Sequence, residues 1–230
     1  ILFLPPFAEE MNMSRRMVAG QARALVRAGY RVMLLDVTGT GDASEDFQDA
    51  SWEIWRQDAL CAADALATAD DSPVLLWGLR LGALLAADVA RSRPDIQQLV
   101  LWQPVLNGEQ QVDQLLRLRT ASAVLNNAVA FDRKSLWKEL RAGQSLHIAG
   151  YSLAPALALE LEQVRLNDCT PPCPVSWLEL GRSAQPHLSV AGARVVEQWA
   201  ERGVRVHSRY VSGEPFWWIP IITWRPNAFT

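Results

Sequence analysis

Residues 75–86, with the sequence LLWGLRLGALLA, join a short apolar run to a corner of small residues and an Ala- and Leu-rich helical pattern. This order predicts a strand, a sharp turn and a helix, the arrangement of a nucleophile elbow built on Gly-x-nucleophile-x-Gly. Gly78 and Gly82 suit the corner, because its central residue takes a strained, usually positive φ beside two close backbones. The central residue is Arg80, where nucleophilic chemistry needs Ser, Cys or Asp.

Arg80 excludes one kind of chemistry and offers another. A guanidinium has a pKa above about 12 and no lone pair free for attack, so Arg80 cannot accept an acyl group. The same planar group binds carboxylate, phosphate or sulfate through paired hydrogen bonds. The N–H of Leu81 and the start of the following helix also favour negative charge. These groups predict an anion site at the corner.

The composition fits one domain with a dense core: 230 residues, half of them hydrophobic and ten of them Trp. A net charge of −3 without basic runs argues against nucleic acid and anionic membrane surfaces as partners. No apolar run approaches the roughly 20 residues that cross a bilayer. The sequence starts at Ile1 rather than Met, so an upstream targeting signal stays open and the cytoplasm is the default expectation.

Strand and helix patterns alternate over most of the sequence, which predicts an α/β fold with a mostly parallel sheet and helices on both faces. Ser14 or Asn12 is expected to cap the first helix. The expected strands are 1–4, 31–36, 73–77, 96–102, 174–180 and 204–211, and the expected helices are 14–29, 51–69, 82–92 and 188–202.

Residues 103–172 break this alternation with helical patterns and no β-branched strands. They are expected to form an inserted helical cap over the carboxyl ends of the strands, where such sheets bind ligands. The expected core is therefore 1–102 with 173–230, and the helices expected in the cap are 109–128, 133–142 and 154–166.

Neither a metal nor a cofactor is expected. Cys61 stands alone, and Cys169 and Cys173 lie in CTPPC without a second pair or a nearby His, a weak pattern for zinc. The glycines of DVTGTGDAS, residues 36–44, set a turn, but their spacing fits neither a Walker loop nor a dinucleotide fingerprint.

The order of elements, with DxxGxGxxS and the GxRxG corner, resembles the α/β-hydrolase fold. Further blocks resemble one family within it, the exosortase A system-associated hydrolase 2 family; they are PPFAEEMNMSRRM (5–17), GLRLGA (78–83), WQPVLNG (102–108), LLRLR (115–119) and GEPFW (213–217). The resemblance implies a link to bacterial exopolysaccharide and protein-sorting systems, and a hydrolase title that rests mostly on fold kinship. Relative to that family, the first two strands are expected to be absent.

The resemblance also says where a catalytic triad would lie. The base His would follow the last strand, in SGEPFWW (212–218), which contains no His. His207 is the nearest of the three histidines but lies several residues too early, and the acid would be near Glu179 or the following GRSAQ loop. Without nucleophile and base, an acid has nothing to orient, and standard serine-hydrolase catalysis is not expected. The cluster Phe216, Trp217, Trp218 and Trp224 is expected to be core or interface, or alternatively to line a sugar or lipid cleft.

The candidate site combines the corner with loops expected near it. The fold places a second oxyanion donor at Phe7 or Ala8. Glu9, Glu10 and Glu214 could each pair with Arg80, so structural pairing and ligand binding both stay open. The predicted substrate-binding residues are Phe7, Ala8, Glu10, Arg80, Leu81 and Glu214.

Two functions follow. The first is a noncatalytic or noncanonical protein that binds a small anionic, acyl- or acidic-sugar-like ligand, with homo-oligomerisation open. The second is an active esterase or thioesterase that uses displaced groups such as Ser152 and His207, or water activated by Glu9 or Glu10. Ser152 lies in HIAGYSLAPALA (147–158), which also mimics strand, Gly-x-Ser and helix, but a helix N-cap is the favoured role for it.

Overall fold

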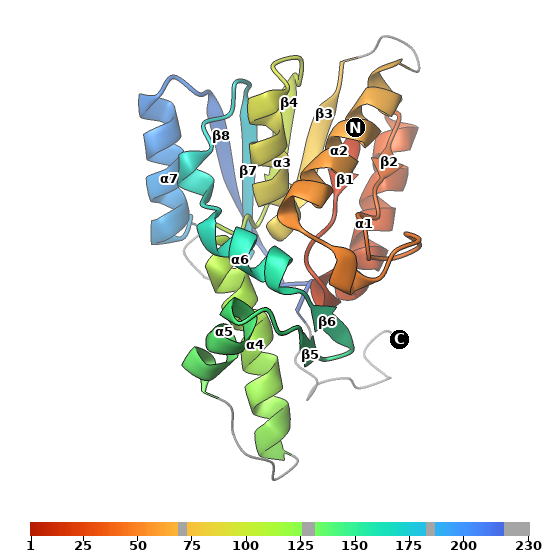
Figure 1. Ribbon diagram of the computed structural model, residues 1–230. Helices are drawn as coiled ribbons and strands as arrows, with labels where there is room; N and C mark the ends of the chain where they lie inside the picture. Colours follow the sequence, from red (N-terminus) through yellow and green to blue (C-terminus); the bar gives the residue numbers. More distant parts are fainter. Residues whose placement is uncertain (69–72, 126–131, 183–186, 219–230) are drawn as a thin grey trace, which may run out of the picture.

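The computed structural model describes residues 1–68, 73–125, 132–182 and 187–218 (Figure 1). A six-stranded sheet of order β2-β1-β3-β4-β7-β8 forms the centre, and every neighbouring pair is parallel. This confirms the α/β class with a mostly parallel sheet. The strands are β1 (Leu2–Leu4), β2 (Met33–Leu34), β3 (Leu75–Leu79), β4 (Gln98–Trp102), β7 (Val175–Gly181) and β8 (Val206–Ser212).

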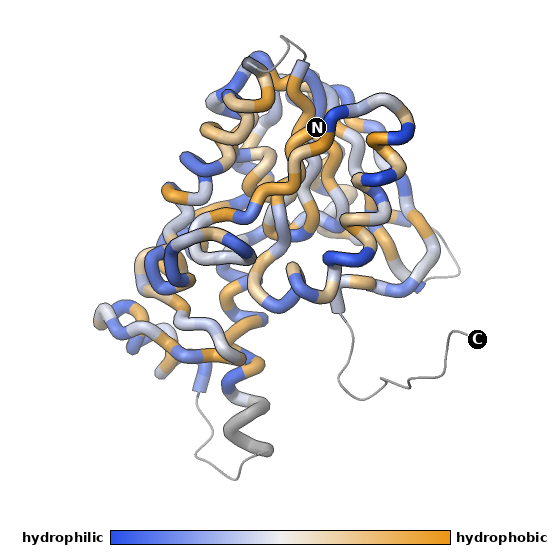
Figure 2. Tube along the Cα trace, turned by 90° about the vertical axis from the view of Figure 1, so that its right-hand side faces the viewer, coloured by the Kyte–Doolittle hydropathy of each residue, from blue (hydrophilic) through white to orange (hydrophobic). Residues whose placement is uncertain are grey.

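Helices cover the two faces of the sheet, and the alternating side chains of β3 show the division. Leu76 packs into the larger core with α2, α3 and α7, whereas Trp77 and Leu79 pack with α1 and the segment after β8. Figure 2 shows apolar segments gathered in the interior of this body. The helices of the two faces are α1 (Glu9–Arg27), α2 (Trp52–Thr68), α3 (Leu81–Ser92) and α7 (Val190–Glu201), and a short 3-10 helix, η1 (Phe47–Asp49), precedes α2.

Most of the segment between β4 and β7 lies beyond the carboxyl ends of the strands (Figure 1). It contains a feature that the sequence pattern did not indicate, an antiparallel hairpin of β5 and β6. Each strand has only three residues, and the turn uses Ala149 and Gly150 at φ values of 48° and 89°. The elements of this segment are α4 (Gly108–Leu125), α5 (Arg133–Arg141), β5 (Leu146–Ile148), β6 (Tyr151–Leu153), α6 (Pro155–Gln163) and the 3-10 helix η2 (Leu166–Asp168).

Two predicted helix caps are wrong. Helix α1 begins at Glu9, and its N-cap is Ala8, whereas Ser14 is buried inside the helix and donates a hydrogen bond to the Met11 carbonyl (3.1 Å). Ser152 lies on β6, and the N-cap of α6 is Ala154. Because α1 starts early, Glu9 and Glu10 belong to its first turn rather than to a loop.

Candidate functional site

The corner after β3 has the geometry of a nucleophile elbow. Arg80 is the N-cap of α3, with φ 56° and ψ −118°, so the central residue has the strained backbone that the pattern predicts. A Cβ on Gly78 would lie 2.3 Å from the Gly82 carbonyl oxygen, and a Cβ on Gly82 would lie 2.1 Å from the Leu4 carbonyl oxygen. Both contacts are with backbone, so only glycine fits either position.

The Arg80 side chain is held by Glu10 from the first turn of α1. Nη2 of Arg80 lies 3.1 Å from Glu10 Oε1, and Nε donates to the same oxygen at 3.2 Å. Nη1 donates to the Gln103 carbonyl at 3.4 Å. The Arg80 and Glu10 side chains are 15% and 7% exposed. Of the three candidate carboxylates, Glu10 is therefore the partner of Arg80, and the pair is enclosed.

Burial dominates the electrostatics of Glu10. Loss of solvent raises the pKa of its carboxyl above the ordinary value, and the charge and hydrogen bonds of Arg80, with a smaller effect of Gln111, pull it back in part. Oε2 is buried and has no well-formed hydrogen bond to any described residue. The carboxylate depends on Arg80 for its charged form.

The segment after β8, where a base His would be expected, reaches the elbow with the indole of Trp217. Cζ of Arg80 lies 5.5 Å from the centroid of a Trp217 ring, and Trp217 is 7% exposed. Phe216 packs edge-on against Trp217 and Trp102. An indole N–H only donates, so Trp217 cannot act as a general base. Trp218 is 43% exposed, and Trp224 lies outside the described residues.

The expected oxyanion donors, Phe7 or Ala8 and the N–H of Leu81, are next in sequence to the elbow and to the start of α1. Ala8 and Arg80 have nearly the same backbone, with Ala8 at φ 50° and ψ −126°, and each is the N-cap of the helix that follows neighbouring strands β1 and β3. The N–H of Leu81 is in the first turn of α3 and has no partner within the helix. Phe7 and Leu81 line a cavity of about 10 Å³, which is room for about one water molecule.

Comparison with known proteins identifies the family of this chain. Residues 10–166 match the Hydrolase_4 family model, described as serine aminopeptidase, S33. The chain belongs to this family. No curated protein matches the sequence.

Solved structures show the same fold as this S33-type chain. Est1E from Butyrivibrio proteoclasticus, solved with ferulic acid, shares 17% identity with a TM-score of 0.62, over 93% of this chain and 79% of that chain. The alpha/beta hydrolase domain-containing protein 10 from mouse shares 17% with a TM-score of 0.57, over 92% and 80%. A putative hydrolase from Agrobacterium vitis shares 17% with a TM-score of 0.57, over 92% and 78%. At these identities the likeness establishes the α/β-hydrolase fold.

The other acidic candidates of this S33-type chain have partners of their own. Glu214 pairs with Arg182 on the surface, where both side chains are largely exposed, so of the three carboxylates that could have paired with Arg80 this one does not. Glu9 accepts hydrogen bonds from Asn12 and from the Tyr151 hydroxyl, both at 3.3 Å. Burial, followed by the charge of Glu9, raises the pKa of Tyr151 to about 12.

Glu179 and His207 also lie apart from the elbow. The buried Glu179 carboxylate accepts from the Ser189 N–H at 2.7 Å and from Trp177 Nε1 at 3.0 Å, so it anchors the start of α7. His207 lies on β8, opposite Ser176 of β7. Strands β4 and β7 separate β8 from β3, the strand that leads into the elbow. Neither residue is among the contacts given above for the Arg80 side chain, which are Glu10, the Gln103 carbonyl and Trp217.

Sequence reasoning missed a Ser–His contact in the hairpin. Ser152 Oγ lies 2.8 Å from His147 Nδ1, because the two residues face each other across β5 and β6. The sequence carried only a weak signal for this contact: Gly150 suits a two-residue turn, but Ala149 is not a residue that marks such a turn. Both side chains lie at the surface.

The described residues contain no group of His, Cys, Asp or Glu that could hold a metal ion. Cys61, Cys169 and Cys173 are free thiols, and burial raises the pKa of Cys169 and of Cys173 to about 11. Within the described part of the chain, no helix is long and apolar enough to pass through a membrane.

Proposed function

We propose that this chain is a noncatalytic member of its family, which acts by binding rather than by hydrolysis. One observation carries the proposal: the elbow presents Arg80, whose guanidinium is held by Glu10 and covered by Trp217. Acyl transfer needs a nucleophile at this position and a base within hydrogen-bond reach of it. Arg80 and Trp217 supply neither.

The ligand expected at the elbow is a small anion, an acyl compound or an acidic sugar. Phe7, Ala8, Leu81 and Arg80 supply positive or donor groups for it, but Glu10 already holds the guanidinium. The Glu10 carboxylate neutralises the guanidinium, so an anion at Arg80 uses the N–H donors that Glu10 and Gln103 leave free, or competes with Glu10 for the others. Glu214 has no part in this proposal, since it pairs with Arg182.

A cellular setting is part of the same proposal. The blocks at 5–17, 78–83 and 102–108 support a role as an accessory protein of bacterial exopolysaccharide or exosortase systems, in the cytoplasm. The remaining blocks, at 115–119 and 213–217, support the same family. The proposed organisation keeps a core of 1–102 and 173–230 with a cap of 103–172.

A second candidate, an esterase centred on Ser152, has one observation in its favour. The 2.8 Å contact between Ser152 Oγ and His147 Nδ1 is a nucleophile–base pair in distance. The structures of similar fold also include an esterase domain, from a Rhodothermus marinus protein. The Ser152–His147 contact lies at the surface, however, and Ser152 sits on a strand rather than at a strained corner before a helix. These features favour the noncatalytic function.

Ester turnover tests both candidates. The wild-type protein and Ser152→Ala are incubated with short and long p-nitrophenyl esters, acyl thioesters and methyl ferulate. We expect no release above the rate in buffer for either protein. Turnover by the wild type that disappears in Ser152→Ala would reject the noncatalytic function and support an esterase that uses Ser152. Turnover that persists in Ser152→Ala and disappears in Glu10→Gln would point to water activated by Glu10.

A further inference from the structure

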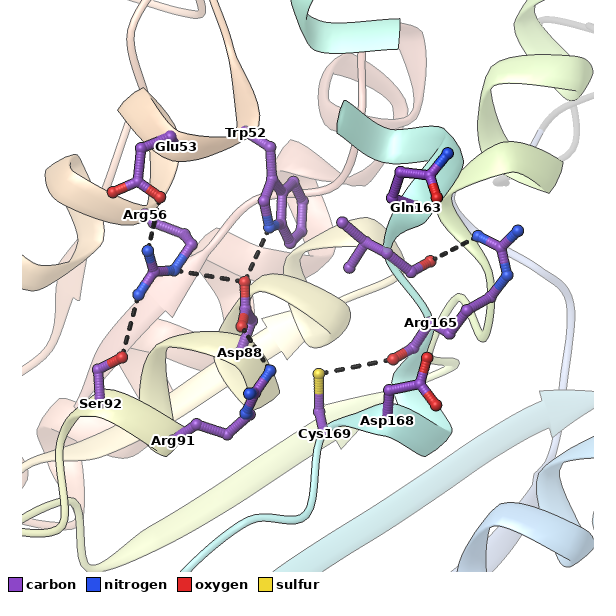
Figure 3. A pocket seen from close by; sticks show the side chains of 11 residues that line it. Trp52, Glu53, Arg56, Asp88, Arg91, Ser92, Gln163, Arg165, Asp168 and Cys169 are labelled. Atoms are coloured by element: carbon purple, nitrogen blue, oxygen red, sulfur yellow. Dashed lines mark hydrogen bonds and ion pairs between the residues drawn. The ribbon is translucent and has the colours of Figure 1, made fainter. Parts of the chain in front are cut away.

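A polar cleft, whose lining side chains are drawn in Figure 3, lies at the opposite end of α3 from the elbow. Its volume is about 470 Å³, and it opens between α2, α3 and the junction of α6 with η2. The elbow is at the start of α3, whereas the cleft is at the end of that helix, about 10 Å from Leu81 to Asp88 along the axis. The lining residues are Trp52, Glu53, Arg56, Asp88, Arg91, Ser92, Gln163, Val164, Arg165, Asp168 and Cys169.

One wall of the cleft is held in place by its own contacts. Asp88 accepts a hydrogen bond from Trp52 Nε1 at 2.8 Å and lies 3.3 Å from Arg56 Nε. Arg56 also donates to Glu53 at 2.6 Å and to Ser92 at 3.0 Å. These hydrogen bonds and ion pairs hold the side chains of this wall against one another, so the wall keeps its shape without a ligand.

The other groups have hydrogen-bonding capacity to spare. The side chains of Gln163 and Asp168 make no hydrogen bond or ion pair with another described residue. Arg91 is 51% exposed; its five N–H donors make a long 3.4 Å contact with Asp88 and a contact with the Cys169 thiol, and the others are left for a ligand. Figure 3 shows Arg91 and Asp168 on either side of Cys169. The cleft therefore offers a donor group on one side and acceptor groups on the other.

The charges of the lining balance, which sets the class of ligand. Three arginines, Arg56, Arg91 and Arg165, and three carboxylates, those of Glu53, Asp88 and Asp168, line the cleft, so a ligand of either sign lies near a like charge. A neutral ligand rich in hydroxyl groups avoids this cost, because each hydroxyl both donates and accepts. Planar guanidinium, carboxylate and amide groups suit neighbouring hydroxyls, and a cavity of about 470 Å³ lies within the usual range for small-molecule sites.

We propose that this cleft binds an uncharged polyhydroxy ligand of the size of a mono- or disaccharide. Arg91 donates to ligand hydroxyl oxygens, Asp168 accepts from ligand hydroxyls, and the Gln163 amide does both. The binding is separate from the chemistry of the elbow, so it can hold or fail whatever the ester assay shows.

Binding is measured by saturation-transfer NMR and calorimetry, with a panel of neutral mono- and disaccharides that includes glucose, maltose, cellobiose and lactose. Inorganic phosphate, glucuronate and the dipeptide Ala-Ala test an anionic or a zwitterionic ligand. We expect a neutral sugar to bind more tightly than any charged probe. Asp168→Asn and Gln163→Ala should each weaken that binding about tenfold or more. Asp42→Asn, the same chemical change on an exposed loop, should leave it unchanged.

Thermal unfolding of each variant shows that the fold is retained. The proposal fails if no neutral sugar of the panel binds, or if phosphate, glucuronate or Ala-Ala binds most tightly. It also fails if Asp168→Asn and Gln163→Ala, both folded, bind the sugar as the wild type does.

Discussion

The guanidinium of Arg80 and the carboxylate of Glu10 meet 3.1 Å apart, at the starts of the two helices that follow the neighbouring strands β3 and β1. The contact joins residues 70 positions apart in the sequence. It places a neutralised ion pair at the point where a serine hydrolase presents its nucleophile. The ion pair at the elbow is therefore largely enclosed by the fold.

Removal of the Arg80 guanidinium should be costly. Arg80→Ala leaves the buried Glu10 carboxyl without a cation, and breaking such a pair typically costs about 3–5 kcal/mol of unfolding free energy. Urea unfolding at pH 7 measures the loss. Arg182→Ala removes an exposed pair with Glu214 and should cost under about 1 kcal/mol. Equal small losses for both variants would contradict an enclosed pair.

The pH dependence of stability should report the raised pKa of Glu10. A carboxyl with a raised pKa binds more protons in the folded state, so its contribution to stability is full below its ordinary pKa of 4.5 and is lost as pH rises through the folded value. The wild-type stability minus that of Glu10→Gln should therefore fall with pH from about 4.5 upward. Urea unfolding from pH 4 to 7.5 measures this difference. A difference that rises with pH would mean that Arg80, rather than burial, sets the pKa.

The two elbow glycines should not tolerate a methyl group. Gly78→Ala and Gly82→Ala place Cβ 2.3 Å and 2.1 Å from backbone oxygens, so each should abolish folding or lower the melting temperature severely. Gly20→Ala is the matched control, because Gly20 lies within α1 and a Cβ there meets nothing within 4 Å. It should raise stability by about 0.5–1 kcal/mol. Calorimetry of the three variants decides; a folded Gly82→Ala of normal stability would contradict the tight corner.

Trp217 should hold the segment after β8 against the elbow. Trp217→Ala removes a buried ring over Arg80 and should cost about 3–5 kcal/mol. The neighbouring Trp218 is 43% exposed, and Trp218→Ala should cost under about 1 kcal/mol. Unfolding monitored by circular dichroism compares the two variants, and the reverse order of losses would show that Trp218 anchors the segment.

The sheet and the elbow were predictable because local patterns encode both. Short apolar runs separated by helical spacing give the parallel strands, and Gly78 and Gly82 mark the corner. The cap of α1 was not predictable in the same way, since Ala8 caps it through backbone geometry and no capping side chain marks the start. The β5–β6 hairpin was not predicted, because strands of three residues are too short to show an alternation of apolar and polar side chains.

The partners of Arg80 depend on tertiary structure. Three carboxylates stood near the expected corner, and only the true start of α1 turns Glu10 inward while Glu9 stays exposed. The absence of a His in SGEPFWW was visible in the sequence. The sequence did not show that Trp217 lies over Arg80. Arg80 follows β3 and Trp217 follows β8, and β4 and β7 lie between these two strands in the sheet.

The central claim, that this chain acts without a catalytic serine, is tested most directly by a fluorophosphonate probe. The folded wild-type protein is incubated with the probe, and its intact mass and tryptic peptides are measured. Ser152→Ala and a known serine esterase serve as controls. We predict no covalent adduct on the wild type, while the esterase is fully labelled. A stoichiometric adduct on any serine of the wild type would contradict the account, and its loss in Ser152→Ala would assign the activity to the hairpin.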